Sequence, residues 1–213
     1  MKMKSSFSWQ NGANKESIMY PIGILSLQGA FIEHEAMLHR LGASCMEIRN
    51  LKDLQQPISG LVLPGGESTV QGKLLQDEGL FEPLQKKIVG GLPVLATCAG
   101  LILLAKHLEN DPTTWFGTLP VTVRRNAYGR QLGSFITTAP LRGIGDMTMN
   151  FIRAPYITKT DPAVEILAAV ENRIVAVRYR NQLALSFHPE VGTDTRIHQM
   201  FLSMIEKQVS ADR

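Results

Sequence analysis

The chain has 213 residues, a formal net charge of +3, 44% hydrophobic residues and 19% charged residues. This length allows one sizeable hydrophobic core, and the composition is that of a globular α/β protein rather than a disordered one. The small and evenly spread charge does not indicate nucleic acid as a partner. No window approaches the roughly 18 consecutive apolar residues of a membrane span, so no membrane partner is expected.

Residues 1–19 form a polar N-terminal segment that we expect to be a flexible tail. The segment is positively charged but lacks the apolar run of about 7 to 15 residues that a signal peptide needs. No repeat or low-complexity stretch marks a second domain, so residues 20–213 are predicted to be a single domain. Cys45 and Cys98 lack metal-type spacing and predict free thiols in a reducing cytoplasm, with a disulfide between them as the alternative.

Short apolar runs alternate with helical patterns in the first half of the chain. Strands are predicted over residues 22–27, 44–49, 60–66 and 91–98. Helices are predicted over residues 30–42, 68–75 and 99–108. The alternation favours right-handed βαβ crossovers and a largely parallel sheet with helices on both faces. Ligands of such sheets bind at the carboxyl ends of the strands.

The second half contains strand-like pieces joined by tight turns. These pieces cover residues 120–131, 134–140, 149–157 and 164–190. The turns at 171–173 and 180–182 predict antiparallel hairpins, and residues 194–209 predict a last helix with an apolar face that belongs to the core. We therefore expect a flavodoxin-like three-layer α/β/α sandwich whose central sheet is mostly parallel, with antiparallel strands in the second half.

The stretch "LATCAGLILL" places Cys98 where a predicted strand runs into a predicted helix. A nucleophile on such a sharp turn needs small neighbours, and Ala96, Ala99 and Gly100 are small. The start of the helix would lower the pKa of the thiol, and the following amide could donate to an oxyanion. A buried cysteine that acts only as a small apolar side chain fits these ten residues equally well.

Among the five histidines, His188 differs from the rest because it ends an apolar strand and precedes Pro189 and Glu190. Residues i and i+2 of an extended chain point to the same side, so Glu190 could hold the imidazole while its other nitrogen faces a thiol. A simple strand-ending turn is the alternative. The remaining histidines fall on predicted helices, where a solvated or hydrogen-bonded side chain is the simpler interpretation: His34, His39, His107 and His198.

The stretch "LPGGES" at residues 63–68 is a third candidate element. Gly65 and Gly66 allow close backbone approach, and their amides could face a substrate oxygen. The stretch does not fit the phosphate-loop pattern, and an ordinary strand-to-helix turn is the alternative. Because all three elements follow predicted strands, one sheet can present them together, which favours a Cys-His-Glu site acting on an amide or ester.

Six motifs resemble a known family in their order along residues 20–206. "PGGES", "TCAGL" and "FHPE" resemble the class I (triad) glutamine amidotransferases. "LSLQGAFIEHE", "RRNAYGRQ" and "FIRAP" narrow the resemblance to the glutaminase subunits of pyridoxal 5′-phosphate synthase, the PdxT family. The resemblance implies hydrolysis of L-glutamine to L-glutamate and ammonia, and delivery of the ammonia to a synthase subunit that makes pyridoxal 5′-phosphate. It implies no cofactor and no metal ion.

The resemblance also assigns catalytic roles. Cys98 is expected to be the nucleophile, His188 the general acid and base, and Glu190 the residue that orients His188. The backbone amides of Gly66 and Ala99 are expected to form the oxyanion hole.

Glutamine binding is assigned by the same resemblance to Gly66, Glu67, Ser68, Arg125, Ile152 and Arg153. Arg125 or Arg153 could clamp the α-carboxylate, while Glu67 or backbone carbonyls meet the α-ammonium group. A solvated surface charge is the alternative for each arginine. Gln28 is expected near the active site, at the interface with the synthase subunit.

Two residues depart from the family pattern. Ala96 stands where glycine is more common, and Arg124 stands where an acidic residue is common. We expect a slight change in the turn and in local surface charge, respectively. Three other functions are alternatives: a glutaminase that serves another synthase, such as that of the histidine pathway, a catalytically silent binding protein, and a cysteine protease or esterase. The motifs around Gln28 and Arg125 oppose a glutaminase of another pathway. The complete triad opposes a silent binding protein, and the charged residues suited to an amino-acid substrate oppose a protease or esterase.

Overall fold

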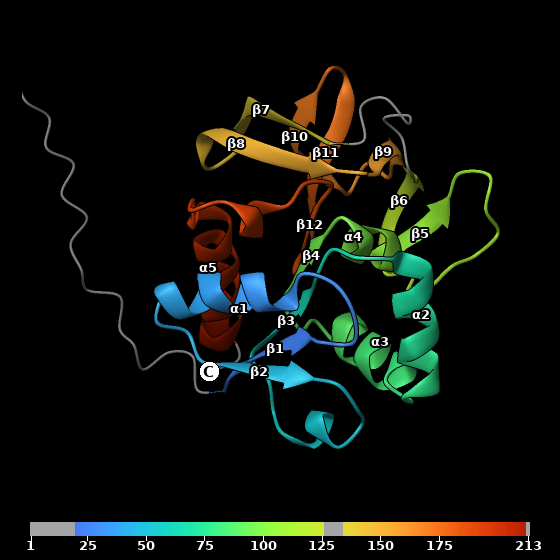
Figure 1. Cartoon of the computed structure of the whole chain (residues 1–213), viewed down its shortest axis with the longest axis vertical. Helices are drawn as coiled ribbons and strands as arrows, with labels where there is room; N and C mark the ends of the chain where they lie inside the picture. The colour runs from blue at the N-terminus through green and yellow to red at the C-terminus, as the bar shows by residue number, and fades with distance from the viewer. Residues whose placement is uncertain (1–19, 126–133, 212–213) are drawn as a thin grey trace, which may run out of the picture.

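The computed structural model describes residues 20–125 and 134–211 (Figure 1). The predicted tail over residues 1–19 lies outside the described residues, as does most of the "RRNAYGRQ" motif.

The central feature of the described chain is a ten-stranded sheet with the order β2-β1-β3-β4-β12-β11-β9-β6-β5, in which β10 also pairs with β11. The strands are β1 (Ile22–Leu25), β2 (Cys45–Ile48), β3 (Gly60–Leu63), β4 (Val94–Thr97), β5 (Ala105–Leu108), β6 (Leu119–Arg124), β9 (Tyr156–Thr160), β10 (Glu165–Val170), β11 (Arg173–Tyr179) and β12 (Gln182–Leu185). Neighbours from β2 to β12 are parallel, whereas the pairings of β11 with β12, β10 and β9, and of β9 with β6, are antiparallel.

Helices and a small hairpin surround this sheet. The α-helices are α1 (Phe31–Arg40), α2 (Ser68–Asp77), α3 (Phe81–Val89), α4 (Ala99–Leu104) and α5 (Arg196–Ala211). Short 3₁₀ helices are η1 (Asp53–Gln55) and η2 (Pro189–Val191). The hairpin consists of β7 (Ser134–Leu141) and β8 (Gly145–Ile152) and forms a separate two-stranded sheet.

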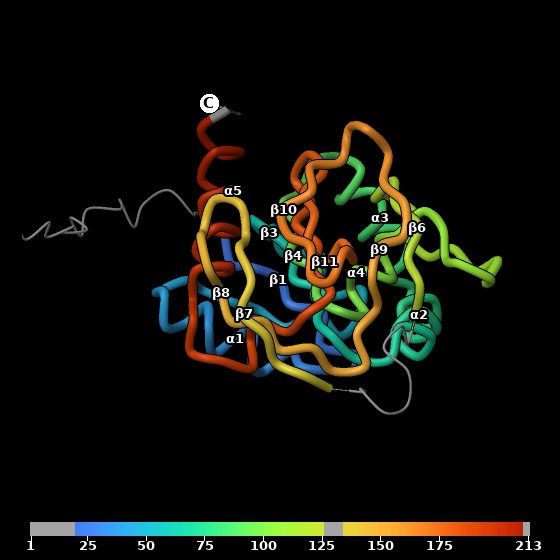
Figure 2. Tube along the Cα trace, turned by 90° about the horizontal axis from the view of Figure 1, so that it is seen from above, coloured from blue at the N-terminus to red at the C-terminus, as the bar shows by residue number. Residues whose placement is uncertain are grey.

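The core has two parts, one on each face of the sheet, because side chains alternate along the central strands. In β3, Leu61 and Leu63 face the part that includes Leu75 of α2, whereas Val62 faces the part that includes Phe201 of α5. Figures 1 and 2 accordingly place α1 and α5 on one side of the sheet and α2 and α3 on the other. The predicted three-layer α/β/α fold, with its antiparallel strands in the second half, is confirmed.

The two predicted hairpin turns are also present. Glu171 and Asn172 both have positive φ, 49° and 60°, between β10 and β11. Positive φ at both central residues is the geometry of the two-residue turns that match the twist of a hairpin. Arg180, with φ of 52°, lies in the turn between β11 and β12.

The helix predicted over residues 99–108 is wrong in its second part. It ends at Leu104, and Ala105 turns to an extended ψ of 137°, so that residues 105–108 form β5 and pair with β6. Sheet pairing here outweighs the local helical preference. His107 therefore lies on a strand, although it is solvated as expected. Similarly, the piece predicted over 149–157 is two strands, β8 and β9, divided where Arg153 adopts a φ of 45°.

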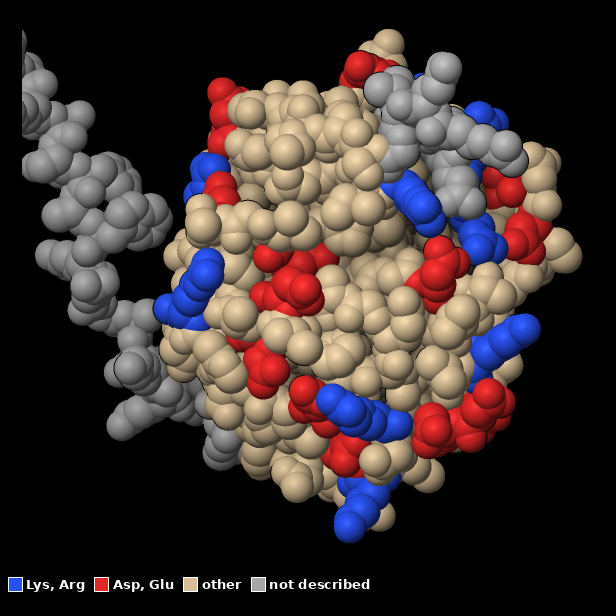
Figure 3. All heavy atoms as spheres, viewed as in Figure 1, with Lys and Arg blue, Asp and Glu red and all other residues tan. Residues whose placement is uncertain are grey.

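None of the helices in residues 20–125 and 134–211 is long and apolar enough to cross a membrane. On the face that Figure 3 shows, the described Lys and Arg side chains are interspersed with Asp and Glu side chains.

Candidate active site

The three candidate elements lie at the carboxyl ends of neighbouring strands. "PGGES" follows β3, Cys98 follows β4 and His188 lies three residues after β12, and these strands are adjacent and parallel in the sheet. Crossover connections place such strand ends at one edge of the sheet, where ligands of parallel sheets bind. The structure thus brings together residues that are up to about 120 positions apart in the sequence.

Cys98 occupies a strained turn between β4 and α4. Its φ of 47° and ψ of −98° are unusual for a residue with a side chain, and its amide donates to the Leu185 carbonyl at 2.8 Å. Strain of this kind is found where the surrounding structure fixes a functional group. A Cβ atom at Gly100 would lie 2.1 Å from the Leu63 carbonyl oxygen, so only glycine allows α4 to begin this close to β3.

Ala96, the first departure from the family pattern, lies inside β4 rather than in the turn. It is fully buried and pairs in register with Leu63 of β3 and Ala184 of β12. The positive φ of Cys98 forms with alanine at this position, so the departure leaves the turn intact. Arg124, the second departure, is exposed and pairs with Glu109 and with the Tyr156 hydroxyl.

His188 lies between Cys98 and Glu190. Its Nδ1 lies 2.7 Å from Glu190 Oε1, and its backbone amide donates to the Asn150 carbonyl of β8 at 2.8 Å. The imidazole lines the same cavity as Cys98, whose thiol lies 3.9 Å from the Ile152 carbonyl oxygen. Burial acts to lower the pKa of His188, but the hydrogen bonds to Cys98 and Glu190 outweigh it and raise the pKa to about 10. The imidazole is therefore protonated at neutral pH, which is the state that activates a neighbouring cysteine.

Glu190 is a buried carboxylate, with 4% of its surface exposed. Burial acts to raise its pKa, but the imidazoles of His34 and His188 outweigh burial and hold the pKa below its ordinary value. The side chain is therefore ionised at neutral pH and can stabilise the protonated form of His188.

The glycine loop after β3 directs one amide toward the site. The Gly65 carbonyl accepts a hydrogen bond from the Ala30 amide at 3.0 Å. Because the peptide bond is planar and trans, the Gly66 N–H points the opposite way from that carbonyl. A Cβ atom at Gly65 would lie 2.4 Å from His188 Cε1, so a side chain at this position would displace the imidazole. Ala99, which carries the other expected oxyanion amide, follows Cys98 and opens α4, where backbone N–H groups have no partner within the helix.

A cavity of about 490 Å³ opens over these groups, within the range of small-molecule sites, roughly 300 to 1,000 Å³. It is lined by Gln28, Gly66, Glu67, Ser68, Cys98, Ile102, Arg125, Ser134, Ile152, Arg153 and His188. Every residue expected to bind glutamine therefore faces one cavity, together with the expected nucleophile. Glu190 lies behind His188, and Ile102 and Ser134 are lining residues that the sequence did not indicate.

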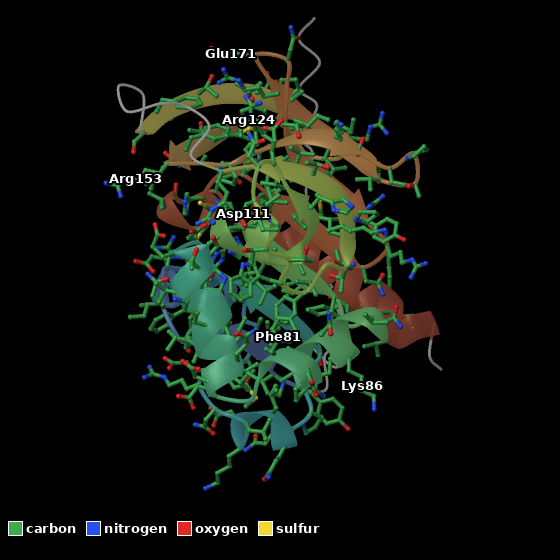
Figure 4. The ribbon with its side chains drawn as sticks, turned by 90° about the vertical axis from the view of Figure 1, so that its right-hand side faces the viewer. Phe81, Lys86, Asp111, Arg124, Arg153 and Glu171 are labelled. Carbon is green, nitrogen blue, oxygen red and sulfur yellow. The ribbon has the colours of Figure 1, made fainter. Side chains whose placement is uncertain are left out.

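The two arginines of the cavity differ in how they are held. Arg125 is half-buried, and its guanidinium contacts Asp111 Oδ2 at 3.2 Å and Thr69 Oγ1 at 3.0 Å. Arg153 is exposed and lies at the left-hand edge of the molecule in Figure 4. Arg125 is thus the pre-oriented cation of the site. Asp111 and Thr69 were not predicted, because no local pattern links them to Arg125.

Gln28 is tied to the glycine loop. Its Oε1 accepts from the Glu67 amide at 2.8 Å, and its backbone carbonyl accepts from Gln71 Nε2 at 2.9 Å. Gln71, which was not predicted, also donates to the Pro64 carbonyl at 3.2 Å. Gln28 therefore positions the loop that carries Gly66, while its expected place at a partner interface stays a prediction.

The remaining histidines fall into two groups. His39 and His107 are exposed, as expected for solvated side chains. His34 and His198 are fully buried and hydrogen-bonded to each other, which agrees with the simpler interpretation, but the contact of His34 with Glu190 was not predicted.

Both cysteines are free. Cys45 is half-buried on β2, and burial raises the pKa of its thiol to about 12. It is therefore unreactive at neutral pH, because the thiolate is the nucleophilic form of cysteine.

Comparison with known proteins gives concordant matches. The model of the SNO glutamine amidotransferase family matches residues 24–207. The chain is 61% identical over 190 residues to the pyridoxal 5′-phosphate synthase subunit PdxT of Desulfitobacterium hafniense, covering 89% of this chain and 96% of the relative. It is 60% identical over 184 residues to the PdxT subunit of Methanocorpusculum labreanum, covering 86% and 97%. A crystal structure of a glutamine amidotransferase superposes with a TM-score of 0.82 at 40% identity, covering 86% of this chain and 98% of that one. The chain therefore belongs to the SNO glutamine amidotransferase family.

Proposed function

We propose that this chain is the glutaminase subunit of a pyridoxal 5′-phosphate synthase and hydrolyses L-glutamine to L-glutamate and ammonia. The observation that carries the proposal is the juxtaposition, at one cavity, of a thiol on a strained turn and an imidazole, with a buried carboxylate 2.7 Å from that imidazole. Membership of the glutamine amidotransferase family supports the substrate, and relatives named PdxT at 60% and 61% identity support the pathway.

In the first half of the reaction, the thiolate of Cys98 attacks the side-chain amide carbon of glutamine. The carbonyl oxygen becomes an oxyanion, which the amides of Gly66 and Ala99 stabilise by hydrogen bonds. His188 then gives its proton to the amide nitrogen, the carbon–nitrogen bond breaks, and ammonia leaves. The product on the protein is a γ-glutamyl thioester of Cys98.

In the second half, water replaces ammonia. His188, now neutral, takes a proton from the water as its oxygen attacks the thioester carbon. The same two amides stabilise the second oxyanion, the carbon–sulfur bond breaks, and glutamate leaves with the thiolate of Cys98 restored. Glu190 keeps the imidazole oriented and stabilises its charged form throughout, as the carboxylate of a triad does.

The charges of the cavity suit an amino-acid substrate. Arg125, held by Asp111 and Thr69, offers a fixed guanidinium for the α-carboxylate, and Arg153 offers a second cation at the rim. Glu67 lines the same cavity and suits the α-ammonium group. Gly66, Ser68 and Ile152 complete the lining around the side chain of the substrate.

We further propose that the ammonia passes to a synthase subunit that makes pyridoxal 5′-phosphate, and that Gln28 contributes to the contact with that subunit. A cytoplasmic location suits a nucleophilic thiol that must stay reduced. We also propose that residues 20–213 are one domain, because β12 from the second half lies between β4 and β11 in the central sheet.

The test measures glutamate release by native protein and by Cys98→Ala, each with and without the synthase subunit. We expect slow hydrolysis by the native chain alone, faster hydrolysis with the synthase subunit, and a loss of at least about 10⁴-fold in the variant, as for nucleophiles of other triads. Equal rates for native protein and Cys98→Ala would overturn the proposal.

Labelling with a glutamine-mimicking electrophile provides an independent check. At neutral pH, we expect one adduct, on Cys98, and none on Cys45, whose pKa is raised to about 12 by burial. Cys45→Ala is the matched control and should keep both the adduct and the native rate. An adduct on Cys45 would contradict the assignment of the nucleophile.

A further inference from the structure

A pair of buried histidines lies behind the triad and has no role in the steps above. His34 comes from α1 and His198 from α5, and neither side chain is exposed. His34 Nδ1 lies 3.0 Å from His198 Nε2, and His34 Nε2 lies 3.1 Å from Thr97 Oγ1. The same Nε2 lies 3.4 Å from Glu190 Oε2. Contacts therefore run from α5 through α1 to the carboxylate that holds His188.

The second oxygen of Glu190 depends on this pair. Oε1 is engaged by His188, whereas Oε2 is fully buried and has no well-aligned hydrogen bond to any residue the structure describes. An ionised carboxylate oxygen is costly to bury without a donor. The N–H of His34 Nε2, within 3.4 Å, can supply one.

The partners of His34 decide which of its nitrogens carries the proton. If Nδ1 of His34 were protonated, the lone pair of its Nε2 would face the negative Glu190 oxygen. His34 Nδ1 would then donate to His198 Nε2, so the proton of His198 would be on its own Nδ1. That buried N–H has no partner in the described chain. If Nε2 is protonated, its N–H faces Thr97 and Glu190, and Nδ1 accepts from His198 Nε2. Then only an acceptor of His198 stays unpaired, and unpaired buried acceptors are more readily tolerated than donors.

We propose that His34 is a positioning residue for the glutaminase reaction, a neutral imidazole whose Nε2–H holds the second oxygen of Glu190, with His198 fixing its tautomer from behind. The inference rests on the proposed function and extends it to two residues that touch neither substrate nor Cys98. By holding Glu190 in place and ionised, His34 keeps the imidazole of His188 directed at the nucleophile.

The surroundings keep both rings uncharged. Burial lowers the pKa of His34, and His188 acts in the same direction, against the opposing effects of Glu190 and Glu33. Burial and His34 lower the pKa of His198 to about 3, with Glu190 opposing. The pair therefore offers the carboxylate an N–H dipole rather than a second positive charge.

The experiment compares His34→Leu, His34→Gln and native protein in complex with the synthase subunit. Leucine fills the buried space without a donor, whereas the side-chain amide of glutamine can place an N–H where Nε2 lies. We expect His34→Leu to lower kcat by about 10- to 100-fold with little change in KM, which is the usual loss when a residue that orients a catalytic group is removed. His34→Gln should recover most of that loss. His39→Leu, an exposed histidine on the same helix, is the matched control and should keep native kinetics.

The pH dependence separates positioning from a purely structural role. Without the His34 donor, Glu190 takes up a proton at higher pH, so the acid limb of kcat/KM in His34→Leu should move upward by about half a pH unit to one pH unit. The titratable groups that face His34 are Glu33 on its own helix, His188 directly before η2, Glu190 within η2, and His198 on α5. A loosened scaffold would lower the rate equally at every pH and leave the limb unmoved.

His198 gives a second arm that leaves His34 in place. His198→Leu removes the donor to His34 Nδ1 and frees the other tautomer, so we expect a smaller loss, about threefold to tenfold, and an acid limb displaced in the same direction. When His198→Leu is added to His34→Leu, kcat should fall by less than about twofold further, because the contact of His34 with Glu190 is already lost. If His34→Leu does not fold, His198→Leu decides the question by itself.

Two outcomes would overturn the inference alone. The first is native kinetics in His34→Leu or, if that variant does not fold, native kinetics in His198→Leu. The second is an equal loss of kcat in His34→Leu and His34→Gln with no displacement of the acid limb. Absence of glutamine hydrolysis by the native complex would overturn the proposed function and this inference with it.

Discussion

On the pocket side of His188, the charged groups of the site are exposed or half-buried and come from loops and strand ends, as Arg125, Glu67 and Arg153 do. On the other side, behind Glu190, the groups are sealed from solvent and come from two helices, α1 and α5. Solvated charges can bind the charged groups of a substrate, whereas a buried wall can fix the geometry of the catalytic groups. We therefore expect changes on the pocket side to act on KM and changes on the buried side to act on kcat.

The largest effect should come from the buried side, at Glu190 itself. Glu190→Gln keeps the shape but removes the charge that stabilises protonated His188 and selects its tautomer. We expect kcat to fall by about 10³- to 10⁴-fold, with KM nearly unchanged, as for the carboxylates of other triads. Steady-state kinetics of the complex measure this, with Glu82→Gln, on the exposed surface of α3, as the control. If Glu190→Gln mainly raised KM, the expected division of effects between the pocket side and the buried side would be wrong.

An intermediate effect is expected on the pocket side, at Arg125. Arg125→Lys keeps the charge but loses the planar fork that Asp111 and Thr69 hold in place. We expect KM for glutamine to rise by about 10- to 100-fold, while kcat at saturation changes far less. Asp111→Asn should raise KM by a smaller factor, about threefold, because the guanidinium stays but is less constrained.

The neighbouring residue provides the control for this prediction. Arg124 is exposed, pairs with Glu109 away from the cavity, and is not among the residues that line it. Arg124→Lys should therefore leave KM at the native value. A fall in kcat without a rise in KM in Arg125→Lys would place Arg125 with the orienting groups instead of the substrate-binding groups.

The last prediction concerns stability instead of kinetics, and it is a pH dependence that belongs to the buried side. The pKa of His188 is raised in the folded protein to about 10, from 6.5 as its ordinary value. A raised pKa means that His188 stabilises the fold fully below about pH 6.5 and progressively loses this contribution as the pH rises toward about 10. The free energy of unfolding of native protein, relative to His188→Gln, should therefore decline across that interval.

Chemical unfolding at several pH values measures this decline. Native protein compared in the same way with Val89→Ala, a change at an exposed residue that has no titratable side chain, should show no such slope between pH 6.5 and 10. A constant difference between native protein and His188→Gln across the interval would show that the imidazole is not held protonated by its buried partners.

Much of the fold and site followed from local pattern. The strands of the parallel half, the turn at Cys98, the loop at Gly66 and the element ending at His188 each have a signature within about ten residues, because a strand end followed by small residues restricts the backbone locally. Residues 105–108 were predicted wrongly as helix because their conformation is not determined by the local pattern. Their strand depends on β6 being available as a partner, which no short window of sequence reveals.

By itself, the sequence determined the fold class, the family and the order of most of the elements, since periodicity, glycine-containing turns and ordered motifs are properties of short segments. Only the tertiary structure decided which distant side chains support the site. Asp111 and Thr69 reach Arg125 from other elements, and His34 meets His198 across 164 positions of the chain. Such pairs depend on how the layers pack against the sheet, and packing brings together residues that have no relation along the sequence.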